Sequence, residues 1–299
     1  MEYHNPVLLN DSIDALAIKK DGVYVDVTFG GGGHSREILN RLGGSGKLIA
    51  FDQDIDAKRN KIDDSRFILI EENFRYIGRF LKFYGVNKVD GILADLWVSS
   101  HQFDEAEIGF SIRFDGALDM RMNQSSRVSA KKIINTYSEE MLANILFMYG
   151  ELRNAKVIAR TIVEARIESE IETSFQLRKI LQKFLPKAKE HKILAQIFQA
   201  IRIEVNEELE VLKEFLIQIP NLLNPEGRLS VISYHSLEDR LVKRFIRTGL
   251  FEGEPEKDFF GNTNVPLQKL GKLITPNQEE VKKNNRARSA KLRVAKLKT

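Results

Sequence analysis

Four consecutive glycines, Gly30–Gly33, constrain this chain more than any other feature of its sequence. They follow the β-branched run Val23–Thr28, which predicts a strand, and they precede a helical pattern that begins at Ser35. A strand that ends in glycines and turns into a helix directs backbone N–H groups and the positive helix end toward one point. Glycine also lets a ligand approach the backbone where a Cβ atom would clash. The sequence therefore predicts a ligand-binding loop at the carboxyl end of the first strand.

Further apolar runs alternate with helical patterns along the first third of the chain and return near its end. Strands are expected at Val23–Thr28, Lys47–Asp52, Arg66–Ile70, Gly91–Asp95 and Arg228–Tyr234. Helices are expected between the first four strands, at Ser35–Leu42, Ile55–Lys61 and Phe74–Tyr84. This alternation predicts an α/β fold with a parallel sheet and right-handed crossovers. The nearly continuous apolar character of several strands is typical of strands buried on both faces.

The middle of the chain has a different pattern. Residues 97–127 are expected to form a long ordered loop, and the stretch after them has helical periodicity without a convincing strand. Helices are expected from Thr136 or Ser138 to Tyr149, over Asn154–Glu168, from Ser174 to the residue before Pro186, and over Ile193–Ile219. Pro220 and the N-P-E-G turn at Asn224–Gly227 are expected to end the last helix. We therefore predict an all-helical insertion at residues 123–199, and an α/β domain formed by residues 1–122 and 200–299.

The glycine loop does not fit the two common phosphate-binding motifs. In G-x-G-x-x-G, the third glycine would fall on Ser35 or Arg36, and no G-K-[ST] follows for a Walker loop. S-adenosylmethionine carries no phosphate, and its ribose hydroxyls favour a carboxylate at the end of the next strand. Asp52 occupies that place, twenty residues after Gly32. A flexible turn and a helix N-cap are the alternative interpretations of the glycines and of Asp52, but the combined pattern predicts a nucleoside cofactor.

The residue types that are absent narrow the possible chemistry. The chain has no cysteine, and its five histidines have no H-E-x-x-H spacing, so no metal site is expected. A G-x-S-x-G nucleophile motif is also absent. Methylation of a pyrimidine at C5 normally needs a cysteine thiolate, so this route is closed. Methyl transfer to nitrogen or oxygen stays open.

Asp95 ends a predicted strand, where an open α/β sheet places its reactive groups. The exocyclic amine of cytosine or adenine gains positive charge as it is methylated, and a nearby carboxylate stabilises that charge. The alternative is that Asp95 only binds the cofactor. Aromatic residues that follow could stack on an unpaired base or pack the loop onto the core, and these are Trp97, Phe103, Phe110 and Phe114.

Positive charge is concentrated near the carboxyl end of the sequence. The net charge is only +4, but Lys282–Lys298 contains eight Lys or Arg residues and no acid. Such a run predicts contact with nucleic acid phosphates, with a solvated tail as the alternative. The alternation over Ala290–Val294 favours a terminal strand. Because the sequence has no apolar run of about 18 residues and no visible secretory leader, we expect a cytoplasmic protein.

Longer motifs extend over the whole chain. They are H-N-P-V-L-L at His4–Leu9, G-G-H-S at Gly32–Ser35, D-L-x-V-S-S at Asp95–Ser100, L-D-M-R-M at Leu118–Met122, F-Q-A-I-R-I-x-V-N-x-E-L at Phe198–Leu209, H-S-L-E-D-R at His235–Arg240 and R-A-R-S-A-K-L-R at Arg286–Arg293. With these motifs in this order, the chain resembles the bacterial ribosomal RNA small subunit methyltransferase H family.

The resemblance implies a fold and an activity. The fold would be a Rossmann-like sheet of the class I S-adenosylmethionine-dependent methyltransferases, interrupted by an all-helical insertion that helps to recognise the substrate. The family methylates N4 of a cytidine in 16S ribosomal RNA beside the decoding centre, so the partner would be 16S ribosomal RNA or the small ribosomal subunit. The resemblance leaves open whether the protein forms a homodimer.

Carried over by motif, the resemblance also implies site residues. Contacts to S-adenosylmethionine would come from Gly32, Gly33, His34, Asp52, Phe74, Asp95 and Gln102. Asp95 is also the expected catalytic carboxylate. His235 is the second catalytic candidate because it lies just past a strand end, although Ser236 or bulk water could equally take the proton from the amine.

Three positions depart from the family pattern. Trp97 replaces a glycine, Ile108 replaces an arginine, and Asn285 replaces a proline. The first two departures favour an alternative hypothesis, a catalytically impaired RNA-binding relative. A nicotinamide-dependent dehydrogenase is a further alternative, based only on G-x-G and Asp52.

Overall fold

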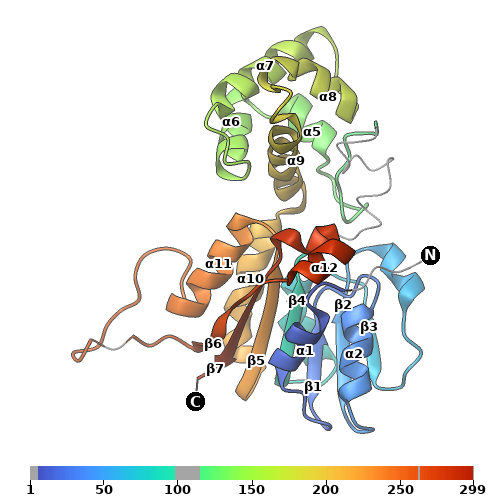
Figure 1. Ribbon diagram of the computed structural model, residues 1–299, viewed down its shortest axis with the longest axis vertical. Coiled ribbons are helices and arrows are strands. Elements are labelled where there is room, and N and C mark those ends of the chain that lie inside the picture. Colours follow the sequence, from blue (N-terminus) through green and yellow to red (C-terminus); the bar gives the residue numbers. More distant parts are fainter. Residues whose placement is uncertain (1–5, 98–114, 262, 299) are drawn as a thin grey trace. The chain divides into compact units, whose positions relative to one another are not determined.

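The computed structural model describes residues 6–97, 115–261 and 263–298, and these divide into two compact units. The first unit comprises Met1–Trp97 and Leu209–Thr299, and the second comprises Val98–Glu208. Figure 1 shows a sheet with helices in the first unit and only helices labelled in the second. Gln102 and Ile108 lie outside the described residues, as do Phe103, Phe110 and Phe114.

The first unit is built on a seven-stranded sheet in the order β3-β2-β1-β4-β5-β7-β6. Neighbouring strands among the first five pair in parallel, whereas β7 is antiparallel to β5 and β6. The predicted parallel sheet and the terminal strand are confirmed. The strands are β1 (Val23–Asp26), β2 (Lys47–Phe51), β3 (Phe67–Ile70), β4 (Val89–Asp95), β5 (Leu223–Ser233), β6 (Leu267–Ile274) and β7 (Lys291–Leu297).

Helices cover both faces of this sheet. On one face, Val25 of β1 packs in a core with Ile77 and Phe215, while on the other face Tyr24 packs with Ile13 and Ile38. Burial on both faces explains why the strands are almost uniformly apolar. The helices of this unit are α1 (Leu9–Leu16), α2 (Gly33–Arg41), α3 (Ile77–Phe83), α10 (Glu208–Leu222), α11 (Ser236–Thr248) and α12 (Gln278–Lys283), with 3-10 helices at Ile55–Asn60, Phe74–Tyr76 and Asn285–Ser289.

The second unit has a hydrophobic core of its own, formed by the apolar stripes of its helices. The side chains of Ser129, Ser138 and Thr173 accept backbone N–H groups at the starts of three helices. This is the capping role that polar residues take in front of a helix. The predicted interruption of the α/β fold by helices is confirmed. The helices are α5 (Ala130–Thr136), α6 (Glu139–Met148), α7 (Ala155–Glu168), α8 (Ser174–Ile180), a 3-10 turn at Gln182–Phe184, and α9 (Glu190–Asn206).

The prediction of one long helix over Ile193–Ile219 is wrong. Glu207 has a φ angle of 51°, so α9 ends at Asn206 and α10 begins at Glu208. The Asn206 amide donates to the Met120 carbonyl (2.8 Å), and its oxygen accepts the Met122 backbone N–H (2.8 Å). Apolar periodicity continues through this break, which is why the pattern alone predicted no interruption.

The predicted helix end and strand start were also misplaced. Pro220 lies inside the last turn of α10, which continues to Leu222, and β5 already begins at Leu223 instead of Arg228. Glu226 belongs to the N-P-E-G sequence that was expected to form a turn. It lies within β5 and has a φ angle of 63°. The pairing of β4 with β5 is irregular between Val89 and Gly91, so the strand absorbs the turn residues as a bulge.

No helix within the described ranges is both long and apolar enough to cross a membrane.

Candidate functional site

The glycine loop leaves the sheet between β2 and β4. The Phe29 backbone N–H donates to the Phe51 carbonyl (2.9 Å), so the chain stays paired up to the first glycine. Gly30 and Gly32 have φ angles of 50° and 76°, values that L side chains rarely adopt. The loop conformation therefore depends on glycine at these two positions.

The individual glycines meet different surroundings. A Cβ atom on Gly33 would lie 2.2 Å from Cγ of Pro6, whereas a Cβ on Gly30 would meet nothing within 4 Å. Gly33 is thus explained by the close approach of the N-terminal segment. Gly30, which the sequence did not single out as a contact, is the glycine that faces open space. The cofactor contacts of Gly32 and Gly33 stay predictions.

Asp52 follows β2 and lies beside this loop, as its place in the sequence predicted. Its carboxylate accepts the backbone N–H of Gly30 (2.7 Å) and of Asp54 (2.9 Å). Burial raises the pKa of Asp52 to about 6, against an ordinary value of 3.8. Each oxygen keeps a further acceptor site, which suits a ligand that donates hydroxyl groups.

Asp95 and His34 face each other at the carboxyl end of β4. His34 Nδ1 lies 3.8 Å from Oδ2 of Asp95, and His34 Nε2 lies 3.2 Å from the Val7 carbonyl oxygen. Because a carbonyl oxygen only accepts, Nε2 carries a proton, and any second proton of the imidazole lies toward Asp95. Burial raises the pKa of Asp95, which His34 and Tyr234 partly oppose. The histidine that follows the glycines therefore borders the carboxylate instead of facing solvent.

Two further buried groups complete this cluster, and sequence reasoning missed both. The Asp26 carboxylate accepts the Ser35 hydroxyl (2.7 Å) and the Thr28 backbone N–H (3.1 Å), and burial raises its pKa. Tyr234 follows β5, and burial together with the charge of Asp95 raises its pKa well above the usual value. An acid inside the apolar run V-Y-V-D-V was a usable signal for Asp26. Tyr234 gave none beyond its place before a motif.

Asp95 and Tyr234 lie beside each other in this cluster. Oδ1 of Asp95 and the hydroxyl of Tyr234 are buried and make no well-formed hydrogen bond to other described residues, but the hydroxyl is close enough to interact with the Asp95 carboxylate. A carboxylate can accept several hydrogen bonds, so Asp95 keeps acceptor capacity for a ligand here. The indole of Trp97 lies next to Tyr234, with ring centroids 4.5 Å apart at an interplanar angle of 60°.

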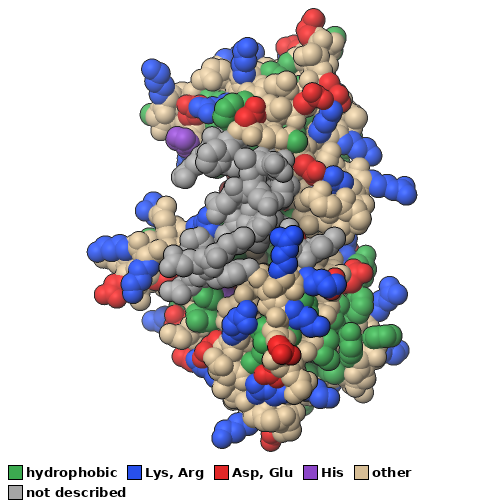
Figure 2. All heavy atoms as spheres, turned by 90° about the vertical axis from the view of Figure 1, so that its right-hand side faces the viewer, with side chains coloured by type: hydrophobic (Ala, Val, Ile, Leu, Met, Phe, Trp, Pro, Cys, Tyr) green, Lys and Arg blue, Asp and Glu red, His purple; other side chains and the backbone are tan. Residues whose placement is uncertain are grey.

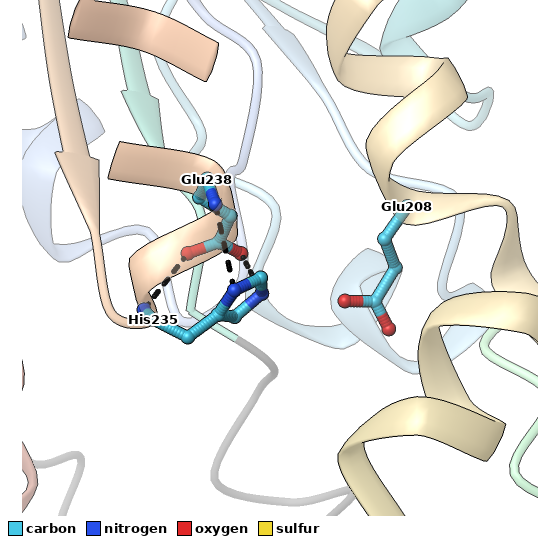
Figure 3. A group of neighbouring side chains, drawn as sticks. All are labelled: Glu208, His235 and Glu238. Atoms are coloured by element: carbon cyan, nitrogen blue, oxygen red, sulfur yellow. Dashed lines mark hydrogen bonds and ion pairs between the residues drawn. The ribbon is translucent and has the colours of Figure 1, made fainter. Parts of the chain in front are cut away.

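The side chain of His235 contacts its own helix, α11. It caps α11, and its Nε2 lies 2.9 Å from Oε1 of Glu238 while Oε2 accepts the backbone N–H groups of Tyr234 (2.9 Å) and His235 (3.3 Å). Figure 3 shows the ring of His235 turned toward Glu238. This capping arrangement accounts for the H-S-L-E motif structurally, and the catalytic role of His235 stays a prediction.

Phe74 begins a 3-10 helix, and its ring packs edge-on against Phe215 at 5.3 Å. The structure thus places Phe74 against a core residue of α10. Its predicted contact with the cofactor stays a prediction.

Comparison with known proteins identifies the family. Residues 1–298 match the model that describes the MraW methylase family. The chain belongs to the MraW methylase family. A protein of Christiangramia forsetii named ribosomal RNA small subunit methyltransferase H is 66% identical over 296 residues, which cover 99% of this chain and 98% of that protein. Proteins of the same name from Flavobacterium johnsoniae and Bacteroides fragilis are 64% and 53% identical, again over 99% of this chain and 98% of theirs.

This membership confirms the resemblance drawn from the motifs and settles the cofactor. The α/β sheet and its interruption by helices are as predicted, and S-adenosylmethionine is the cofactor. The residues present fit it, because the open space at Gly30 and the carboxylate of Asp52 suit a ligand that donates hydroxyl groups. The nicotinamide-dependent alternative is wrong.

Proposed function

We propose that this chain methylates the N4 amino group of a cytidine in 16S ribosomal RNA of the small ribosomal subunit, beside the decoding centre. Its membership in a methylase family supports methyl transfer, and the names of its relatives support a small-subunit RNA substrate. The motif resemblance supports the choice of atom and of site. Since ribosomal RNA is the substrate, the proposal places the activity in the cytoplasm.

The observation that carries the proposal is the carboxylate of Asp95 at the end of β4, which lies beside Tyr234 and keeps acceptor capacity on its buried Oδ1. When bound, S-adenosylmethionine supplies a methyl group on a sulfonium leaving group. The exocyclic amine is a weak nucleophile and becomes positive as its bond to that carbon forms. Asp95 accepts one N–H of the amine and stabilises this charge, and the amine then loses one proton to Asp95 or to water.

Neighbouring groups fix the position of Asp95 for this role. The Asp95 backbone N–H donates to Oγ1 of Thr28 (2.7 Å), which fixes the end of β4 beside the glycine loop. The His34 ring, itself held by the Val7 carbonyl, lies 3.8 Å from the carboxylate and limits how the side chain of Asp95 can turn. In a buried site such fixed groups act more strongly than in water, because less solvent screens them.

A label-transfer assay tests the proposal. Small ribosomal subunits that lack this methyl group are incubated with the protein and S-adenosylmethionine labelled in the methyl group. We expect one label per particle, in the RNA. If a folded protein that binds the cofactor transfers no label, the proposed substrate is wrong.

The helical unit has a surface suited to phosphates. Around α8 and the start of α9, the lysines are exposed and none has an ion-pair partner within the part of the chain that the structure describes; these are Lys179, Lys183, Lys187, Lys189 and Lys192. The neighbouring Arg178 guanidinium lies 6.0 Å from the ring centroid of Phe175, which is 42% exposed. This surface supports a substrate-binding role for the predicted insertion, residues 123–199.

The C-terminal basic run is only partly available to RNA. Arg293 and Lys291 lie 2.7 and 3.4 Å from the carboxylate of Asp239, and Lys296 lies 2.6 Å from that of Glu226. Lys282, Lys283 and Arg288 are exposed, and no described residue pairs with them. Figure 2 shows that, on the face it draws, basic side chains are interspersed with acidic ones and form no continuous patch.

A salt titration measures this contribution. We expect replacement of Lys282, Lys283 and Arg288 by glutamine to make the slope of log affinity against log salt about 2 units less steep, because each phosphate contact to single-stranded RNA contributes about 0.7. Filter binding to 16S RNA between 50 and 300 mM KCl provides the measurement. Lys296→Gln is the control, since its partner is Glu226. An unchanged slope in the triple variant would remove this segment from the RNA interface.

The packing of Trp97 favours a second candidate function, a catalytically impaired RNA-binding relative. The indole occupies space next to Tyr234, where the family has glycine. If the chain is the proposed enzyme, we expect Trp97→Gly to change turnover by no more than about threefold, because the indole packs against the ring of Tyr234. A rise above about tenfold, which equals about 1.4 kcal/mol of barrier, would favour the impaired relative. Single-turnover rates of the two proteins at saturating cofactor decide between them.

A further inference from the structure

Two adjacent phenylalanines stand out on the first unit. Phe259 and Phe260 are 97% and 84% exposed, more than any other large apolar side chain of the described residues. They lie in the segment between α11 and β6, which extends away from the sheet in Figure 1. Exposed aromatic pairs of this kind usually mark a contact with another molecule.

The segment is anchored at its base, so the exposure of the pair is built into the fold. Phe251 stacks on Phe245 of α11 with ring centroids 5.1 Å apart, and the Arg244 guanidinium contacts the Gly253 carbonyl. On the returning side, Val265 is buried, and Lys257 forms an antiparallel bridge with Thr263.

The turn that carries the two rings is also defined. The Phe260 backbone N–H donates to Oδ1 of Asp258 (2.9 Å), and Gly261 N–H donates to the Asp258 carbonyl (2.9 Å). Gly261 has a φ angle of 82°, which requires glycine. The rings meet edge-on, with centroids 5.6 Å apart. The turn therefore holds both rings away from the core.

The charge around the rings indicates the partner. Residues 252–261 contain one lysine, Lys257, and four acids, Glu252, Glu254, Glu256 and Asp258, so this segment carries three net negative charges in a chain of net charge +4. Carboxylates repel RNA phosphates, which argues against stacking of the rings on nucleotide bases. They attract a basic surface, and the two rings then need an apolar cavity within it.

We propose that Phe259 and Phe260, which we call the aromatic tip, dock into an apolar cavity on a basic protein of the small ribosomal particle. The inference rests on the proposed function and adds that the substrate is an assembled particle of RNA and protein. Recognition then has two parts: lysines of the helical unit contact phosphates, and the aromatic tip contacts protein.

Binding to two targets tests the proposal. The first target is the small subunit that lacks the methyl group, and the second is protein-free 16S RNA extracted from the same particles. We expect the double variant Phe259→Ala/Phe260→Ala to bind the particle about tenfold more weakly, as loss of an interface hot spot would predict, and to bind the free RNA unchanged. Phe83→Ala is the matched control, since Phe83 is 79% exposed and lies on α3.

Charge reversal gives a second readout whose sign differs between the partners. Glu252 and Glu256 are exposed and have no partner among the described residues. Glu252→Lys/Glu256→Lys should weaken binding to the particle if the tip contacts a basic protein, and strengthen it if the tip contacts RNA. Equal losses on both targets by the alanine variant, or tighter particle binding by the lysine variant, would overturn the proposal in favour of RNA.

The remaining outcomes separate this proposal from the proposed function. If the wild-type protein methylates the particle and the alanine variant binds it equally well, only the aromatic tip is wrong. If the wild-type protein neither binds nor methylates the particle, both proposals fall.

Discussion

Replacing Asp95 by asparagine is expected to lower the rate of methyl transfer at saturating cofactor by about 10³, within the range for a positioned general base or an electrostatic stabiliser. The amide preserves the size of the side chain but has no negative charge to offer the amine. Affinity for S-adenosylmethionine should change by less than about threefold, because Gly30 and Asp52 are unaltered. Single-turnover label transfer and calorimetric titration of the cofactor measure the two quantities separately.

Thermal stability provides the control for Asp95→Asn. Burial raises the pKa of this carboxyl, because the folded protein solvates its charge less well than water does. Removal of the charge should therefore leave the melting temperature unchanged or raise it. If the variant keeps its transfer rate at saturating cofactor but binds the cofactor at least tenfold more weakly, Asp95 is a cofactor ligand and not the catalytic carboxylate.

Replacing Asp52 by asparagine is expected to weaken binding of S-adenosylmethionine by about 10², the effect of losing charge-assisted hydrogen bonds in a buried site. The amide can accept from Gly30 or Asp54 but cannot accept on both sides as the carboxylate does. Transfer at saturating cofactor should be nearly unchanged. Asp54→Asn is the matched control, because it lies in the same turn. Equal affinities of wild type and Asp52→Asn would exclude Asp52 from the cofactor site.

The pKa of Asp52 adds a pH dependence with a defined sign. Because the pKa rises from 3.8 to about 6 in the folded protein, the stability of the cofactor-free protein should fall as pH increases from about 4 to about 6. Cofactor affinity should change in the opposite direction, since the ionised carboxylate is the better acceptor. Between pH 7.5 and pH 5 we expect the affinity to drop about tenfold, and Asp52→Asn should remove most of this drop.

The sequence pattern predicted those parts of the fold that depend on local signals. The first four strands are apolar runs of the right length, and each lies within two residues of its predicted start. Strand β6 was missed because only Leu267 is buried along it, so its residues resemble a loop. The break at Glu207 was missed because a left-handed residue other than glycine leaves no mark in the apolar period.

The residues of the candidate site also differ in whether local sequence signals predict them. Asp52 was predictable because the distance from the glycine loop to the end of the next strand is nearly fixed in a βαβ unit. Tyr234 was not, because its place beside Asp95 depends on the pairing of β4 with β5, which brings Asp95 opposite Ile232. A contact between residues so far apart in the chain, across a helical insertion, follows only from the completed sheet.

The nucleoside that receives the methyl group reveals which atom this protein methylates. Small subunits that lack the modification are incubated with the protein and S-adenosylmethionine carrying a trideuterated methyl group, and the 16S RNA is digested to nucleosides for mass spectrometry. We predict that the deuterated methyl group appears only in N4-methylcytidine, and that it is absent when Asp95→Asn is used over the same time. Recovery of the label in 5-methylcytidine or in a ribose-methylated nucleoside would contradict the account.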